Sequence, residues 1–211
     1  GRGGRSGVGV ATFERGGFVL DTGQPTERFT TAAPAAGEWD VPGVAARHPV
    51  PEEWRFVLVV PDTPAGRSDD TEDESMRAAV ESADPGVADR ISGLVVRSVL
   101  PAVDAGDAEA FGEAVAEIGR LNGAWYAEQQ GGVYRPPVGD IVAELGRSPA
   151  VTGAGQSSWG PTVYGVTDAD AAEDARDAAH AALDAADVDG EVSVVAGRNR
   201  GARVSEDGRN A

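Results

Sequence analysis

The 211-residue chain is strongly acidic, with 35 Asp and Glu residues against 18 basic residues, all of them arginine, and a net charge of −17. The absence of cysteine excludes disulfides and thiolate metal sites, and the absence of lysine excludes Schiff-base chemistry and a lysine-containing P-loop. Nucleic-acid binding depends on phosphate neutralisation, so the charge argues against such a partner. No apolar run approaches the roughly 20 residues that cross a membrane.

The surface charge also bears on the source of the protein. An acidic, lysine-free surface is typical of proteins that stay soluble in concentrated salt, where repulsion is screened over about 3 Å at 1 M. We therefore expect a cytoplasmic protein of a salt-accumulating organism; a GC-rich genome, which also favours arginine and alanine, is the alternative. Because Gly1 lies inside a glycine-rich loop, we expect an N-terminally truncated product.

The N-terminal part predicts few regular elements. Ser6 is an N-cap for a helix over "SGVGVATFER", and "GGFVLDTG" (16–23) predicts a short strand with a turn. Residues 24–51 contain several prolines and no clear period, which predicts a loop. "RFVLVVP" (55–61) is rich in β-branched and aromatic residues and predicts a buried strand.

Downstream, an acidic loop enters a helix over 66–82, and periodicity predicts two long helices over 86–107 and 108–131 and a short helix over 136–148. A strand–loop–strand unit follows over 150–167, then an acidic helix over 168–187 and a last strand over 190–204. This order predicts an α+β sandwich in which helices cover one face of an antiparallel sheet. The exposed sheet face of such a unit could pair with a second copy, so a homodimer is compatible with the sequence, although no motif requires it.

Acidic residues are missing from three glycine-rich windows. These are residues 1–13, 145–167 and 192–205, and the first and third also carry arginines. Glycines let backbone N–H groups approach a phosphate, a helix N-terminus adds about half a positive charge, and arginine adds bidentate hydrogen bonds. "GRGGRSGVG" therefore predicts a phosphate cradle, with the loop at 153–160 as a second wall. The alternative is that these glycines only make turns.

Several motifs together resemble one family. "GRGGRSGVGVATFERGGFVLDTG", "PEEWRFVLVVP", "EQQGGVYRPPVGDIV" and "GQSSWGPTVYG" are similar to the β-ribofuranosylaminobenzene 5′-phosphate synthase family of the GHMP kinase superfamily. The resemblance extends from residue 1 to about residue 166 and suggests a haloarchaeal member. It implies an α+β, GHMP-kinase-like fold. Residues 1–50 would be the remnant of an N-terminal, ribosomal-protein-like domain, and residues 51–211 a C-terminal, ferredoxin-like α/β sandwich.

The resemblance also implies an activity. Members join phosphoribosyl pyrophosphate to 4-hydroxybenzoate or 4-aminobenzoate, with loss of carbon dioxide and pyrophosphate, on the way to methanopterin. Mg²⁺ would accompany the leaving pyrophosphate, while no metal ligand is assigned in the chain. Two alternatives stay open: an ATP-dependent small-molecule kinase of the same fold, and an inactive truncated paralogue.

The implied roles fall on two loops. Arg5 and Asp21 would be catalytic, with Asp21 stabilising the sugar cation or contacting Mg²⁺; a solvated Arg5 and a turn-forming Asp21 are the alternatives. Trp159 would shield or stack on the ring, or only anchor its loop. The remaining candidates would bind substrate phosphates, unless the second loop only packs: Arg2, Gly3, Gly4, Ser6, Gly7, Gly153, Gly155, Gln156, Ser157, Ser158 and Thr162.

Overall fold

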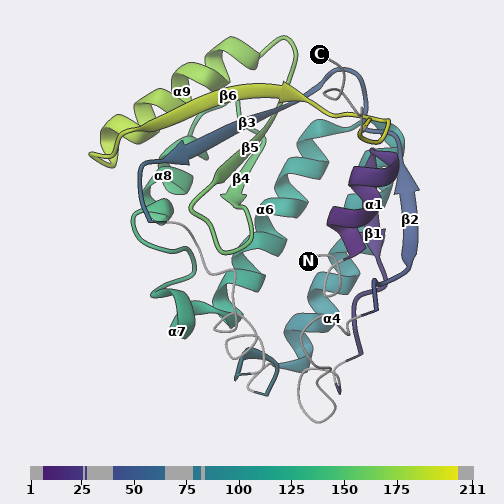
Figure 1. The fold of residues 1–211 in the computed structure, drawn as a ribbon. Coiled ribbons are helices and arrows are strands. Elements are labelled where there is room, and N and C mark those ends of the chain that lie inside the picture. The colour runs from purple at the N-terminus through teal and green to yellow at the C-terminus, as the bar shows by residue number, and fades with distance from the viewer. Residues whose placement is uncertain (1–6, 26, 28–39, 65–77, 82–83, 204–211) are drawn as a thin grey trace, which may run out of the picture.

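The computed structural model describes residues 7–25, 27, 40–64, 78–81 and 84–203. Its N-terminal part holds α1 and a two-stranded sheet, and the rest of the chain forms a four-stranded sheet with helices (Figure 1). The predicted division into residues 1–50 and 51–211 stays a prediction. In chain order the elements are α1 (Gly7–Arg15), β1 (Phe18–Asp21), β2 (Val44–His48), β3 (Trp54–Pro61), α4 (Pro85–Leu94), η1 (Val95–Val99), α5 (Leu100–Ala105), α6 (Ala108–Trp125), α7 (Ala127–Gln130), α8 (Val138–Leu145), β4 (Gly153–Gln156), β5 (Val163–Asp168), α9 (Ala172–Ala185) and β6 (Gly190–Ala196).

The two-stranded sheet corrects one prediction. β1 pairs antiparallel with β2, with Phe18 opposite His48 and Leu20 opposite Ala46. The loop predicted over residues 24–51 therefore contains a strand at Val44–His48. Its residues are mostly exposed and show little apolar alternation, so the signal that reveals a half-buried strand is absent. The pairing with β1 supplies what the local pattern lacks.

The four-stranded sheet has the order β4-β5-β3-β6, and every neighbouring pair is antiparallel. β3 is central and carries the run Phe56–Val60, in which Val57 and Val59 are fully buried. β5 pairs along β3 from Trp54 opposite Asp168 to Val59 opposite Val163. The predicted α+β class and the antiparallel sheet are thus confirmed.

Helices cover both faces of this sheet, which corrects the expectation of a single covered face (Figure 1). Successive strand residues point to opposite faces. Val57 and Val59 of β3 pack with α8 and α9 in one apolar cluster. Trp54 and Phe56 belong to a second cluster that includes Phe111 of α6. β3 reads as a continuous apolar run because both of its faces are covered.

The helix predicted over residues 86–107 is continuous, but its middle turn is a π-helix. It divides into α4, the π-helical turn η1 and α5. The Leu100 N–H donates to the Val95 carbonyl, and Pro101 at the start of α5 has no N–H to donate. The wider π turn accommodates this missing donor.

The third acid-free window joins the two parts of the molecule. The Arg47 guanidinium donates to the carbonyls of Arg15, Gly16 and Asn199 at 2.8–3.1 Å. The Asn199 side chain makes paired hydrogen bonds with the backbone of Val50. Arg47 thereby lies at the negative end of the α1 dipole. In this window the glycines and arginines at 197–201 serve packing and backbone contacts at the C-terminal end of α1.

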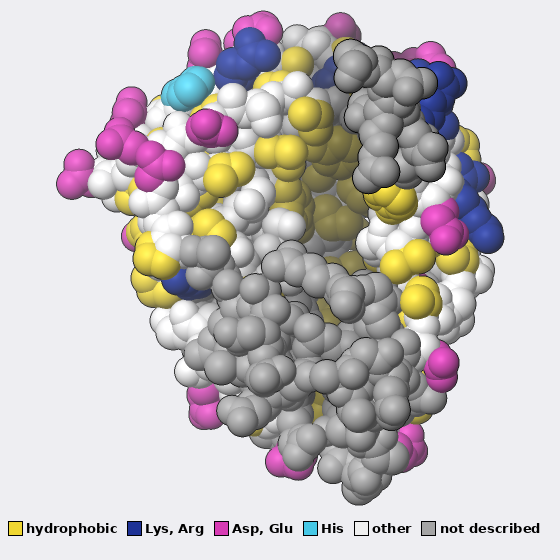
Figure 2. Space-filling model, in the orientation of Figure 1, with side chains coloured by type: hydrophobic (Ala, Val, Ile, Leu, Met, Phe, Trp, Pro, Cys, Tyr) yellow, Lys and Arg dark blue, Asp and Glu magenta, His cyan; other side chains and the backbone are white. Residues whose placement is uncertain are grey.

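On the face seen in Figure 2, a hollow with hydrophobic walls lies between the sheet and α1, and acidic side chains lie mainly around the outline. Within the described residues, no helix is both long and apolar enough to span a membrane.

Candidate functional site

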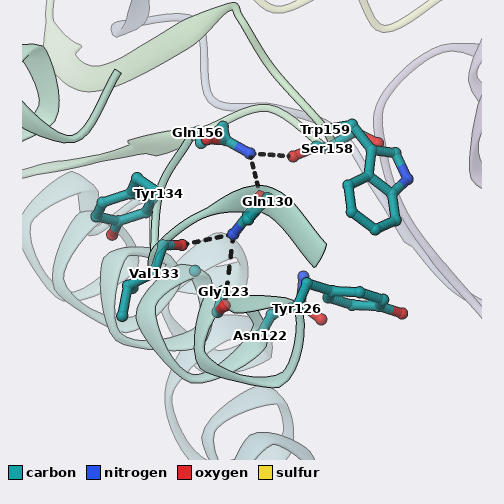
Figure 3. A pocket seen from close by; sticks show the side chains of 10 residues that line it. Asn122, Gly123, Tyr126, Gln130, Val133, Tyr134, Gln156, Ser158 and Trp159 are labelled. Carbon is teal, nitrogen blue, oxygen red and sulfur yellow. Dashed lines mark hydrogen bonds between the residues drawn. The ribbon is translucent and has the colours of Figure 1, made fainter. Parts of the chain in front are cut away.

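A cavity of about 200 Å³ lies under the turn that joins β4 to β5, and we call it the hairpin cavity. Its walls come from three segments: residues 119–126 at the end of α6, residues 130–134, and residues 156–159 (Figure 3). These segments are distant in sequence, so the fold alone brings them together.

Two glutamine side chains hold the three segments in place. Gln156 Nε2 donates to Gln130 Oε1 at 3.0 Å and to the Ser158 carbonyl at 2.8 Å, while Gln156 Oε1 accepts from the Arg135 N–H at 2.8 Å. Gln130 Nε2 donates to the carbonyls of Val133 and Gly123 at 2.8 and 3.4 Å (Figure 3). The amide of Gln156, predicted to bind substrate, is therefore used to fasten the hairpin to α6 and α7.

The turn between β4 and β5 has its own internal geometry. The Ser157 N–H donates to the Thr162 carbonyl at 2.8 Å, and the Gly160 N–H donates to the Ser157 carbonyl at 2.9 Å. Ser158 has φ 51° and Gly160 has φ 67°, in the left-handed region that glycine adopts without strain. The turn presents Ser158 and Trp159 to the cavity, while Ser157 and Thr162 close it through their backbones.

Aromatic side chains form one wall of the hairpin cavity. The ring centroids of Tyr126 and Trp159 are 4.9 Å apart and the rings are nearly perpendicular, at 71° (Figure 3). Edge-to-face pairs of this kind are favourable and hold both rings in a defined orientation. Trp159 thus both anchors its turn and faces the cavity.

Two tyrosine hydroxyls lie close together beside the hairpin cavity. A Cβ placed on Gly119 would lie 3.6 Å from the Tyr164 hydroxyl and 4.0 Å from the Tyr134 hydroxyl, so the two hydroxyls converge over this glycine. Burial raises the pKa of Tyr164 to about 12, with a smaller increase from Tyr134 and a decrease from Arg120. Burial also raises the pKa of Tyr134. Both hydroxyls are therefore neutral donors at physiological pH.

A second cavity, of about 420 Å³, lies between α4 and α6, and we call it the helix cavity. Ile91, Ile118 and Trp125 give it a mainly apolar lining. It shares Gly119 and Asn122 with the hairpin cavity, so the two spaces meet at this turn of α6. Trp125 Nε1 is buried beside it and has no hydrogen-bond partner among the described residues.

Gly153 and Gly155, predicted to bind phosphate, are buried in β4. A Cβ at Gly153 would lie 1.9 Å from the Gly112 carbonyl oxygen of α6. A Cβ at Gly155 would lie 2.6 Å from the Tyr164 hydroxyl. Both glycines therefore permit close packing of β4 against α6 and Tyr164.

Asp21 lies at the N-terminus of α1. Its Oδ2 accepts from the N–H groups of Gly7 and Val8 at 2.8 and 3.0 Å, and its Oδ1 accepts from the Gly23 N–H at 3.0 Å. Gly7 also allows close approach, since a Cβ there would lie 2.6 Å from the Pro42 carbonyl oxygen. The carboxylate of Asp21 is thus the anion that this helix end binds in the described structure. Arg2, Gly3, Gly4, Arg5 and Ser6 lie outside the described residues.

The described residues do not build a metal site of their own. Among the described residues, no group of three His, Asp or Glu side chains could hold a metal ion. The oxygens of Asp21 are already bound to three backbone N–H groups. The described residues therefore offer no ready set of ligands for Mg²⁺.

Sequence reasoning missed Asn122, Tyr126, Gln130 and Tyr134, which all line the hairpin cavity. "EQQGGVYRPP" contains two of them and was noticed only as part of a family resemblance. Asn122 and Tyr126 sit at the end of a helix whose periodicity indicates packing, and nothing in that pattern indicates a cavity.

Comparison with known proteins places the chain. Residues 99–185 match the family described as GHMP kinases C terminal. The chain is 35% identical over 203 residues to the beta-ribofuranosylphenol 5′-phosphate synthase of Methanothermobacter thermautotrophicus, covering 96% of this chain and 59% of that protein. It belongs to the β-ribofuranosylphenol 5′-phosphate synthase family. The synthase of Archaeoglobus fulgidus is 31% identical over 81% of this chain and 51% of its own length.

This chain also resembles the folds of small-molecule kinases. Homoserine kinase from Cytophaga hutchinsonii matches with a TM-score of 0.58 at 17% identity, covering 91% of this chain and 52% of the kinase. At this identity the likeness shows the fold alone. The predicted GHMP-kinase-like fold is thus confirmed. The chain spans somewhat more than half the length of the curated relatives it matches.

Proposed function

We propose that the complete protein is a decarboxylating ribosyl-phosphate transferase that joins phosphoribosyl pyrophosphate to 4-hydroxybenzoate or 4-aminobenzoate. The supporting observation is the 35% identity to a beta-ribofuranosylphenol 5′-phosphate synthase across nearly the whole chain. In the reaction a ring carbon forms a bond to C1 of the ribose as the bond from C1 to pyrophosphate breaks. The ring carbon then loses carbon dioxide, and the electrons of that bond restore aromaticity.

The lining of the hairpin cavity supports this chemistry. Aromatic rings and amide and hydroxyl groups face it, and none of its lining residues is charged, in a chain of net charge −17. A carboxylate there would repel both an aromatic acid and a sugar phosphate, because two like charges about 4 Å apart repel by about 1 kcal/mol even in bulk water. The aromatic rings of Tyr126 and Trp159 would also limit the access of water to the sugar cation.

The phosphate-binding part of the proposal rests on the sequence before α1. Arg2 and Arg5 and the glycines around them would contact the phosphates, and Asp21 would set the position of this loop by capping α1. Mg²⁺ would accompany the pyrophosphate, with no ligand assigned in the chain. Methanopterin-type biosynthesis and a homodimer are further parts of the proposal.

The deciding assay follows the carboxyl carbon. The complete gene product is mixed, in concentrated salt with Mg²⁺, with phosphoribosyl pyrophosphate and carboxyl-labelled 4-hydroxybenzoate or 4-aminobenzoate, with and without ATP. We expect labelled carbon dioxide and pyrophosphate in equal amounts, without ATP. Consumption of ATP on a small alcohol, with no label released, would replace the proposal by a kinase. No turnover of either kind would indicate an inactive paralogue.

A further inference from the structure

We infer that the ring of the aromatic acid sits in the hairpin cavity, against Tyr126 and Trp159, and not in the larger helix cavity. The ligand class rests on the proposed function, while the choice between the cavities rests on the geometry. Gly119 and Asn122 line both cavities, so a ligand bound at this turn of α6 has two adjoining spaces available.

The walls of the hairpin cavity suit a planar ring. Tyr126 and Trp159 hold each other edge to face at 4.9 Å, and the glutamine pair fixes the turn that carries Trp159. A preorganised aromatic wall loses little conformational entropy when a ring packs on it. The helix cavity has the larger volume and includes Trp125 and Tyr164 in its lining, but among the described residues these two rings form no stacked or edge-to-face pair.

The polar groups also favour the hairpin cavity. Asn122, Tyr134 and Ser158 line it, and no hydrogen bond between described residues engages their side-chain amide or hydroxyl groups. They can donate to a carboxylate or to a phenol oxygen. In the helix cavity a carboxylate would reach Ser92, Asn122 and Trp125 Nε1, but most of the lining is apolar, which disfavours a buried charge. The hairpin cavity therefore accommodates both the ring and its charged substituent.

The test places the same charge in each cavity. Ser158 lines only the hairpin cavity and Ser92 only the helix cavity, and both are exposed. Ser158→Asp and Ser92→Asp are thus matched variants, and aspartate tolerates the left-handed backbone at Ser158. Ala124→Asp adds the charge at an exposed position of α6 that lines neither cavity. Circular dichroism and urea unfolding establish that each variant folds.

Two readouts separate the inference from the proposed function. Binding of 4-hydroxybenzoate and of its neutral analogue 4-hydroxybenzamide is measured by saturation-transfer NMR, and KM for the acid by carbon dioxide release at saturating donor. We expect Ser158→Asp to lower the affinity for the acid about tenfold and the affinity for the amide less than about twofold, because the new aspartate repels only the charged acid. Ser92→Asp and Ala124→Asp should leave the binding of both ligands unchanged. Trp159→Leu should weaken both ligands by about fivefold through loss of the aromatic wall.

If Ser92→Asp lowers the affinity for the acid and Ser158→Asp does not, the ring sits in the helix cavity and the inference is wrong. Equal KM values in all variants, with turnover intact, would overturn it while the proposed function stands. Binding that Ser158→Asp removes, without carbon dioxide release by the unmodified protein, would support the ring site and refute the synthase activity. Neither binding nor turnover of an aromatic acid would refute both.

Discussion

Glycines of similar appearance in the sequence have different functions in the structure. Gly9 in α1 has open space where a side chain would be, since a Cβ there would meet nothing within 4 Å. Gly153 in β4 lies against the backbone of Gly112, where a Cβ would come within 1.9 Å of the carbonyl oxygen. Glycine content alone indicates a turn or a phosphate loop equally well. Only the neighbouring element reveals which glycine allows two backbones to touch.

We predict opposite effects of alanine at these two positions. Gly153→Ala should lower the free energy of unfolding by about 3 kcal/mol or prevent folding, because backbone atoms must move to relieve the overlap. Gly9→Ala should raise it by up to about 1 kcal/mol, because alanine has a higher helix propensity. Urea unfolding of both variants checks this. A Gly153→Ala protein of unchanged stability would show that β4 does not pack on α6 as described.

Tyr164 makes stability depend on alkaline pH. Its pKa is raised from 10 to about 12 by burial, so the unfolded chain ionises at lower pH than the folded one. Its contribution is fully present below pH 10 and is lost between pH 10 and 12, with a maximum slope of about 1.4 kcal/mol per pH unit. We expect the free energy of unfolding to fall from pH 9 to 11 less steeply in Tyr164→Phe than in the unmodified protein. Parallel curves would contradict the burial of this hydroxyl. The raised pKa of Tyr134 contributes to the slope that remains.

At the scale of elements, the start of α1 shows a helix N-terminus that binds a carboxylate of its own chain. The sequence correctly predicts a helix N-terminus after a glycine-rich loop, and such a terminus attracts an anion. The anion is the carboxylate of Asp21, which is 14 residues from Gly7 in sequence. The periodicity of one helix cannot indicate that the following strand returns this carboxylate to its first turn.

We predict that Asp21→Asn lowers the free energy of unfolding by about 1–2 kcal/mol, because one oxygen cannot replace two charged acceptors at the helix end. Glu113→Gln, which removes an exposed charge from α6, is the control and should change stability by less than about 0.5 kcal/mol. Urea unfolding gives both values. Full stability with lost turnover in Asp21→Asn would instead indicate a direct catalytic role.

Other elements show where sequence patterns succeed. The β-branched run predicts β3 to within one residue. The apolar spacing predicts α6 from its first residue, but the helix predicted over 108–131 ends at Trp125 and is followed by the short helix α7. β2 carries no such pattern and was wrongly predicted as loop, because its pairing with β1 creates the strand. The Gln130–Gln156 contact joins residues 26 positions apart, so the cavity it frames was not visible in either segment.

The whole molecule carries a net charge of −17, and Figure 2 shows acidic side chains mainly around the outline of the face with the hollow. α9 contributes exposed acids such as Asp174, Asp177 and Asp184, while its alanines pack in the core. Repulsion among these charges opposes folding when little salt is present. The predicted haloarchaeal origin stays a prediction, but the physical consequence of the charge can be measured directly.

We predict that raising NaCl from 0.1 to 1 M, which shortens the screening length from about 10 to about 3 Å, raises Tm by at least about 2–4 °C. The triple variant Asp174→Asn, Asp177→Asn and Asp184→Asn should show a smaller rise, because less repulsion remains to be screened. Thermal unfolding followed by circular dichroism measures both. A fall in Tm with salt would mean that attractive ion pairs outweigh the repulsion.

The sequence by itself determined the α+β class, most of the elements and the family, because periodicity and distinctive motifs are local properties of the chain. It also placed a loop at 153–160, where acidic residues are absent, although residues 153–156 form β4 in the structure. Only the tertiary structure decided that helices cover both faces of the sheet, that Gly153 and Gly155 serve packing, and that Asp21 caps α1. The cavity depends on contacts between α6, residues 130–134 and the turn. Such contacts follow from how the elements pack in space, which no local pattern records.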